Sequence, residues 1–295
     1  MSNLGQIDAS LQSDKGRGPT HNEDFVLWRE PTDPEDEAEN GWIYSVADGV
    51  GGADAGEVAS QFASERLHFH YLELADQPDA QERVKGAFFA ANNDLRNLAK
   101  RMSAAQRMAT TMVAAVIFND DIVITNVGDS RGYLLRKNSL QQVTRDHSLV
   151  AKLLEEGVLT PQQAIDYPRP NVILYSLGSD HEPQIDQFPL KLESGDIVLL
   201  CSDGLTRHLS DEDIAELLIG SPASKAATEL IQLANERGGK DNISVAVIRY
   251  WPGEKKKTMA AAGSASSKAF LWVFTAILSI LQSAGIFFVW LKLFT

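Results

Sequence analysis

Short apolar runs separated by polar turns fill residues 1–250, and this pattern predicts β-strands. The runs are rich in Val and Ile and are bounded by Gly, Asp and Asn, as is typical of strands. We expect strands at Phe25–Trp28, Trp42–Ala47, Met112–Phe118, Ile122–Val127, Tyr133–Arg136, Ile197–Cys201 and Ile243–Tyr250. The turns at residues 119–121 and 128–132 are expected to join consecutive strands as hairpins.

Longer segments with apolar residues spaced three and four positions apart predict amphipathic helices. These segments are Gly56–Leu74, Asp79–Ser103, Asp211–Leu218 and Pro222–Arg237. Helices that lie between groups of hairpin-linked strands predict an α+β fold, with helices packed on a largely antiparallel sheet system. The acidic segment 30–40, which contains two prolines, is expected to be an exposed loop.

The C-terminal pattern is different, because residues 269–291 contain no charged side chain. This stretch is long enough to cross the hydrocarbon core of a bilayer as a helix. Trp272 and Trp290 lie near its two ends, where aromatic side chains of membrane spans gather. We therefore expect a transmembrane helix, since core helices are rarely apolar on every side over such a length.

The basic residues around this span predict its orientation. Lysines at 255–257 and Lys268 precede the span, and only Lys292 follows it. The positive-inside rule then places the N-terminal side in the cytoplasm. We expect a single-pass C-terminal tail anchor in the inner (plasma) membrane, joined by a flexible basic linker, residues 251–268, to a soluble domain, residues 1–250.

Overall composition limits the class of protein. The formal net charge of −13 argues against a nucleic-acid binder, which usually presents a basic face. The single cysteine, Cys201, excludes an internal disulfide and fits a reducing compartment. No apolar signal-peptide core is visible near the N-terminus. The acidic excess fits either ordinary solubility or carboxylates gathered around hard cations.

Acidic residues recur at the ends of the predicted strands. The start of one antiparallel strand lies beside the end of its neighbour, so these side chains can meet at one rim of the sheets. Clustered carboxylates repel one another, and divalent ions relieve that repulsion. An all-oxygen ligand set selects Mg²⁺, Mn²⁺ or Ca²⁺, and two such ions would generate a bridging hydroxide nucleophile. The acidic residues concerned are Glu23, Asp24, Asp48, Asp203 and Asp241, and the amide residue Asn242 follows Asp241.

Seven motifs, spread in order over residues 14–250, carry a resemblance to a known family. They are "NED", "VADGVGG", "MATTM", "NVGDSRGYLL", "TRDHSLV", "SDGLT" and "DNISVAVI". The chain resembles the metal-dependent protein phosphatases of the 2C type, in their bacterial form. The resemblance implies a four-layer α-β-β-α sandwich, in which two antiparallel sheets are flanked by helices.

The resemblance also implies a metal site with two Mn²⁺ or Mg²⁺ ions. Asp48 would bridge the ions, and Asp203 and Asp241 would complete the first position. Glu23 and the carbonyl oxygen of Gly49 would serve the second position.

Further residues are implied around these ligands. Asp24 would hold a metal-bound water, and Asn242 would support the ligands from outside. Asp129 matches the ligand of a third, weaker metal position, although a turn residue that holds Arg131 is an alternative role. Residues 148–177 resemble the flap that lies beside the site in this family.

One position departs from the family pattern. Pro19 stands where the family usually has an arginine that holds the substrate phosphate. Arg17 and His21 are the nearby candidates, and we favour Arg17 because a guanidinium can bind phosphate through two hydrogen bonds.

These observations predict a membrane-tethered serine/threonine phosphoprotein phosphatase. Its substrates would be phosphoserine and phosphothreonine proteins, for example a membrane-bound kinase or the target of such a kinase. Two alternatives remain. The chain could be a catalytically weak or inactive pseudo-phosphatase that acts as a membrane-anchored binding module, or a hydrolase of small phosphoesters.

Overall fold

The computed structural model describes residues 7–51, 55–102, 108–165, 167–169, 171–179 and 181–251. Contacts divide the chain into two units, Met1–Gly253 and Glu254–Thr295. The expected membrane span, 269–291, and all but the first residue of the expected linker lie outside the described residues. Within the described part, no helix combines the length and apolar character needed to cross a membrane.

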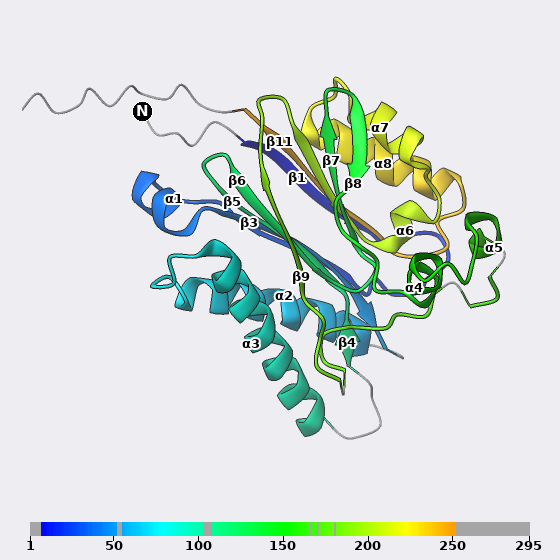
Figure 1. Cartoon of the computed structure of the whole chain (residues 1–295), viewed down its shortest axis with the longest axis horizontal. Coiled ribbons are helices and arrows are strands. Elements are labelled where there is room, and N and C mark those ends of the chain that lie inside the picture. Colours follow the sequence, from blue (N-terminus) through cyan, green and yellow to red (C-terminus); the bar gives the residue numbers. More distant parts are fainter. Residues whose placement is uncertain are drawn as a thin grey trace, which may run out of the picture. The chain divides into compact units, whose positions relative to one another are not determined.

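The first sheet is antiparallel (Figure 1), and the described part of the chain supplies five strands to it. In spatial order they are β1 (Ile7–Asp14), β11 (Ile243–Tyr250), β10 (Ile197–Cys201), β7 (Arg131–Arg136) and β8 (Ser139–Gln142). The interior strands β10 and β11 are almost entirely buried and apolar, as expected for strands covered on both faces.

The second sheet is also antiparallel, and in the described residues it holds six strands. In order they are β2 (Asp24–Arg29), β3 (Trp42–Val50), β5 (Met112–Phe118), β6 (Asp121–Val127) and β9 (Asp186–Lys191), while the short β4 (Ala109–Thr110) pairs with the end of β3.

Helices cover the outer faces of both sheets (Figure 1). Helices α2 (Ala55–Glu73) and α3 (Ala80–Arg101) pack on the second sheet, where they share one buried apolar cluster with its strands. Helices α7 (Asp211–Leu218) and α8 (Ala223–Glu236) pack in the same way on the first sheet.

A third apolar cluster lies between the two sheets. It includes Tyr44 and Val113 of the second sheet and Leu200 and Ala246 of the first, all fully buried. Together the clusters define four layers, helix–sheet–sheet–helix, so the predicted sandwich of antiparallel sheets is confirmed. The predicted strands and long helices also occur, with their ends shifted by a few residues at most.

The expected loop at residues 30–40 is wrong over its second half, which forms helix α1 (Pro34–Asn40). Asp33 caps this helix, because its Oδ1 accepts hydrogen bonds from the backbone N–H of Glu35 and of Asp36, both at 3.0 Å. Capping and acidic residues in the first turn stabilise a helix start, which explains why so acidic a segment is ordered as a helix.

The expected hairpin at residues 119–121 is confirmed, whereas the one at residues 128–132 is wrong. Strand β6 belongs to the second sheet and β7 to the first, so residues 128–130 carry the chain from one sheet to the other. Gly128 has a φ of 107°, a conformation open to glycine. The crossing brings Asp129 to the junction of the two sheets.

The other short helices lie at the rim where the predicted carboxylates meet. Helix α6 (Asp203–Thr206) follows β10 directly, and α4 (Leu149–Glu155) and α5 (Pro161–Ile165) belong to the expected flap. Figure 1 shows α4, α5 and α6 gathered at the same end of the sheets.

Candidate active site

Strand pairing brings the predicted carboxylates to one rim. Asp24 lies directly opposite Asp48 in the register of β2 and β3. Asp203 follows the end of β10, and Asp241 precedes the start of β11, the strand that pairs with β10. The sequence-based expectation that strand starts and strand ends converge is therefore met at this rim.

The pKa values show that these carboxyl groups act on one another. Burial raises the pKa of Asp48 well above its usual range, and the charges of Asp24, Asp203, Asp129 and Asp241 raise it further. Burial, with smaller contributions from Asp203 and Asp241, raises the pKa of Asp24 to about 7. Burial and the charge of Asp203 raise the pKa of Asp129 to about 7. A bound cation would therefore stabilise the ionised forms of these carboxyl groups.

Three buried carboxylate oxygens at this rim receive no hydrogen bond from the described residues. They are the Oδ1 atoms of Asp24, Asp129 and Asp203. Leaving a buried carboxylate oxygen without a partner is costly, and a hard divalent cation relieves that cost. The donor set, oxygen throughout, therefore fits Mg²⁺ or Mn²⁺.

As the side chains are placed, no three His, Cys, Asp or Glu residues in the described ranges converge closely enough to hold an ion. A metal ion would therefore have to draw the carboxylates together.

Glu23 and Gly49 are in contact through the backbone, while their shared role at the second metal position stays a prediction. The backbone N–H of Gly49 donates to the carbonyl oxygen of Glu23 at 3.0 Å. A Cβ atom at Gly56, in the first turn of α2, would collide with the Glu23 carboxylate. Ser60 of the same helix donates its Oγ–H to the Glu23 carbonyl oxygen at 2.6 Å. The sequence pattern placed Gly56 at the start of a predicted helix but gave no indication that it lies against Glu23.

Asn242 supports the loop that carries Glu23. Its Oδ1 accepts from the backbone N–H of Glu23 at 2.7 Å. Its Nδ2 donates to the carbonyl oxygens of Lys15 and His21 at 2.8 and 3.0 Å. One buried amide therefore joins the segment before β2 to the start of β11.

Arg207 is a charged residue of the site that the sequence analysis did not identify. Its Nη1 donates to Asp241 Oδ2 at 2.5 Å, and its Nη2 donates to Asp203 Oδ2. Burial works against the charged form of Arg207, but the neighbouring carboxylates outweigh it and raise the pKa of the guanidinium. The spacing of four residues between Asp203 and Arg207 was the available signal, because such pairs meet on a helix.

Arg131 pairs with Asp146 instead of Asp129. Its Nε and Nη2 donate to the Asp146 carboxylate at 3.0 and 2.7 Å. The alternative role of Asp129, as the turn residue that holds Arg131, is therefore wrong. Asp129 is instead buried near Asp203, and its role at a third metal position stays a prediction.

Arg17, the candidate for phosphate binding, lies in the loop before β2. Its backbone N–H donates to the carbonyl oxygen of Gly239 at 2.7 Å, and its side chain is exposed. A direct role of this guanidinium at the carboxylates stays a prediction.

The expected flap borders the carboxylates. A cavity of about 230 Å³ separates α4 from α6, and its walls include Leu154 and Asn171 from the flap. Asp129, Asp203 and Arg207 also line it. Residues of this segment therefore line a cavity beside the carboxylates, and their role as a flap stays a prediction.

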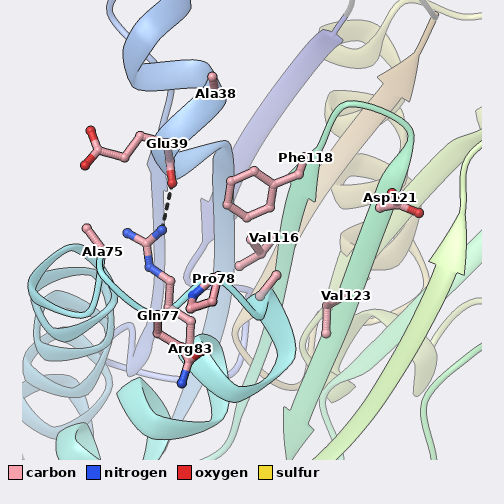
Figure 2. A pocket seen from close by; sticks show the side chains of 11 residues that line it. Ala38, Glu39, Ala75, Gln77, Pro78, Arg83, Val116, Phe118, Asp121 and Val123 are labelled. Carbon is pink, nitrogen blue, oxygen red and sulfur yellow. Dashed lines mark hydrogen bonds between the residues drawn. The ribbon is translucent and has the colours of Figure 1, made fainter.

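A larger cavity, of about 470 Å³, lies elsewhere (Figure 2). Val116 and Phe118 of β5 line it, and this end of β5 pairs with the start of β3, whereas Asp48 lies near the end of β3. Arg83 also lines it and donates to the Glu39 carbonyl oxygen at 2.8 Å. None of the predicted site residues lines this cavity, so it is not part of the carboxylate site.

Comparison with known proteins agrees with this fold. Residues 20–246 match the family model of protein phosphatase 2C. The chain is 37% identical over 246 residues to the serine/threonine phosphatase stp of Listeria welshimeri, covering 82% of this chain and 95% of that protein.

Solved structures give the same result. The serine/threonine phosphatase PstP/Ppp of Mycobacterium tuberculosis is similar with a TM-score of 0.72 and 33% identity, over 83% of this chain and 99% of that one. The catalytic domain of PstP in complex with two manganese ions has a TM-score of 0.70, again with 33% identity over 83% of this chain and 99% of that one.

The fold and its rim of carboxylates define a phosphatase of the metal-dependent type. The chain belongs to the protein phosphatase 2C family, and its enzyme class is that of the serine/threonine protein phosphatases.

Proposed function

We propose that this chain hydrolyses phosphoserine and phosphothreonine in proteins, with two Mn²⁺ or Mg²⁺ ions held at the rim of the two sheets. Asp48, Asp203 and Asp241 would hold the first ion. Glu23, the Gly49 carbonyl oxygen and Asp48 would hold the second. When bound, the ions supply a water nucleophile of lowered pKa and neutralise charge on the phosphoryl group.

The single observation that carries this proposal is the group of buried oxygens of Asp24, Asp129 and Asp203 at one rim, for which the described part of the chain supplies no hydrogen-bond partner. A fold without a cation site would gain nothing from collecting carboxyl groups whose burial and mutual repulsion raise their pKa values. The manganese bound in the structure of PstP supports the choice of ion.

Three further residues, Asp24, Asp129 and Arg17, would bind water, metal or substrate beside these ligands. Asp24 accepts a hydrogen bond from Ser202 Oγ at 2.7 Å through one oxygen, and its other oxygen, which has no partner among the described residues, would hold a water. Asp129 would contribute to a third, weaker metal position beside Asp203. Arg17 would bind the substrate phosphate in place of the arginine that Pro19 replaces.

The test is phosphate release from a phosphothreonine peptide by residues 1–253, with and without Mn²⁺. We expect metal-dependent release that EDTA removes. Asp203→Asn should lower kcat at least about 100-fold, because it removes a charge from the proposed ligand set. Asp211→Asn, a solvent-facing acid in the first turn of α7, is the control and should keep wild-type activity.

A second candidate function, the membrane-anchored pseudo-phosphatase, is favoured by Pro19 and by the pairing of Arg207 with two of the proposed ligands. In that case the folded fragment would release no phosphate at any Mn²⁺ concentration.

We further propose that the C-terminal stretch, residues 269–291, anchors the enzyme in the inner membrane with its catalytic domain in the cytoplasm. The uncharged length and the lysines on its N-terminal side support this proposal. A membrane-bound kinase, or a substrate of such a kinase, would then be a phosphoprotein within reach of the site.

A further inference from the structure

The guanidinium of Arg207 connects two carboxylates of the proposed metal site. Nη1 donates to Asp241 Oδ2 at 2.5 Å, and Nη2 donates to Asp203 Oδ2. Asp203 is thereby held through one oxygen, while its buried Oδ1 has no hydrogen-bond partner in the described residues. Asp203 is thus paired with the Arg207 cation through one oxygen and has its other oxygen available for a second cation.

Asp203 and Asp241 are held in place by contacts that do not involve the Arg207 side chain. Asp241 Oδ1 accepts from the backbone N–H of Asn242 at 3.0 Å. Gly204, next to Asp203, lies so close to the Asn242 carbonyl oxygen that a Cβ atom would collide with it. The backbones that carry the two carboxylates are therefore positioned without the guanidinium.

We propose that Arg207 is a built-in counter-cation, which competes with divalent metal ions for Asp203 and Asp241 and so lowers the metal affinity of the site. This inference rests on the proposed metal-dependent function.

Competition follows from charge, whichever way the ion enters. If the ion shares the carboxylates with Arg207, two cations repel each other across the same oxygens. If the ion displaces the guanidinium, two charge-assisted hydrogen bonds are lost. Both routes lower affinity relative to a site that has a neutral side chain at position 207.

The structure leaves room for displacement. The side chain of Arg207 is 33% exposed, and it borders the cavity of about 230 Å³ between α6 and the flap. The guanidinium can therefore turn away from Asp203 and Asp241 without unfolding α6. Arg207 would neutralise the carboxylates until the metal concentration is high enough to replace it.

The test is calorimetric titration of Mn²⁺ into the full chain in mild detergent, for the wild type and three variants. Arg207→Gln should bind Mn²⁺ with a Kd at least about ten-fold lower than that of the wild type. Arg207→Lys keeps the charge but lacks the two planar guanidinium donors that contact Asp203 and Asp241. Its Kd should therefore lie between those of the wild type and Arg207→Gln. Arg66→Gln should leave the Kd unchanged.

Arg66 is a matched control, because it makes a similar ion pair of similar exposure. Its Nε donates to Asp94 at 2.5 Å, and its side chain is 29% exposed, against 33% for Arg207. A general effect of deleting an arginine would appear in both glutamine variants.

Thermal unfolding provides a second measurement. In EDTA, Arg207→Gln should unfold at a lower temperature than the wild type, because Asp203 and Asp241 lose their counter-cation. Saturating Mn²⁺ should raise its unfolding temperature by more than it raises that of the wild type.

A Kd for Arg207→Gln that equals or exceeds the wild-type Kd would overturn the proposal, and an increase would make Arg207 a residue that positions the ligands. If Arg207→Gln does not fold, a Kd for Arg207→Lys at or above the wild-type value overturns it equally. Failure of the wild type to bind Mn²⁺ at all would instead refute the metal-dependent function, and this inference with it.

Discussion

Asp24 is a carboxyl group of the site whose ionised form is disfavoured by burial. It is 6% exposed, and its pKa is raised from 3.8 to about 7, chiefly by burial. Ser202 and Ser244 act in the opposite direction through hydrogen bonds, but they do not compensate for the loss of water. In the absence of a divalent ion, the folded protein therefore binds a proton here that the unfolded chain releases near pH 4.

This difference predicts a pH dependence of stability in EDTA. The stabilising contribution of Asp24 is fully present below about pH 4 and is lost as the pH rises through 7. Asp24→Asn imitates the protonated form, so it should gain stability relative to the wild type between pH 5 and pH 8. The expected relative gain is roughly 2–4 kcal/mol, measured by urea unfolding at several pH values.

Asp213→Asn is the control for this experiment. The hydrogen bond from Arg237 is the main cause that lowers the pKa of Asp213, so this group stays ionised throughout the pH 5–8 window. Its loss should shift stability by the same amount at every pH. Parallel curves for Asp24→Asn and the wild type would contradict the assignment of Asp24 as the titrating group.

At the scale of elements, the proposed metal-ligating residues lie at the ends of strands. The sequence could therefore predict them wherever it predicted the strands. Asp48 and Asp203 could be predicted as site residues because each one comes at the end of an apolar run. The pairing of the buried strands then determines where these carboxylates lie relative to one another. The edge strands β1 and β9 were missed, because "IDASLQSD" is largely polar and "DQFPLK" contains Pro189. Edge strands have one unpaired side, which tolerates such residues.

The same reasoning explains the failures at the site. Arg207 was not predicted, because its partners depend on the short helix α6 and on the meeting of two strand ends that are distant in sequence. The crossing at residues 128–132 was taken for a hairpin because local turn chemistry does not show which sheet the next strand joins.

Asn242 permits a test of how one amide connects two elements. Asn242→Ala removes the acceptor for Glu23 N–H and the donors to Lys15 and His21. We expect a loss of about 1–3 kcal/mol in unfolding free energy. We also expect Mn²⁺ binding about ten-fold weaker, because the loop that carries Glu23 is no longer fixed. Urea unfolding and calorimetry measure the two effects.

Asn235→Ala supplies the comparison for Asn242. Asn235 donates one hydrogen bond, to Asp14 Oδ1 at 2.9 Å, from helix α8. Its loss should lower stability by a smaller amount and leave the Mn²⁺ affinity at the wild-type value. Equal Mn²⁺ affinities in both alanine variants would show that Asn242 does not act through Glu23.

At the scale of the whole molecule, the catalytic unit and the C-terminal unit separate at residues 253 and 254. All the residues assigned to the site lie in the first unit, and so do the apolar clusters on both sheets. Catalysis and membrane attachment should therefore be separable properties of this chain.

Truncation after residue 251 tests this separation. The shortened protein should keep kcat/KM for a soluble phosphothreonine peptide within about two-fold, because it retains both sheets and the flap. The full chain should float with liposomes in a density gradient, whereas the shortened one should stay at the bottom. The full chain with Ile280→Lys and Leu281→Lys is the control and should lose flotation, since each charge in a span costs about 2.5–3.5 kcal/mol. Flotation of the truncated protein would contradict the anchor.

The burial of Cys201 makes it possible to label the expected flap, residues 148–177, at one introduced cysteine and to measure its distance from bound metal. Cys201 is the only cysteine of the chain, and it is fully buried in β10, where burial raises the pKa of its thiol to about 12. Because thiolates are the reactive form, the native protein behaves toward maleimide reagents as if it had no cysteine. A cysteine introduced at Val158, which is 61% exposed between α4 and α5, would therefore accept a spin label or a fluorophore alone. Paramagnetic broadening of such a nitroxide by bound Mn²⁺ would then report the separation between flap and metal in solution.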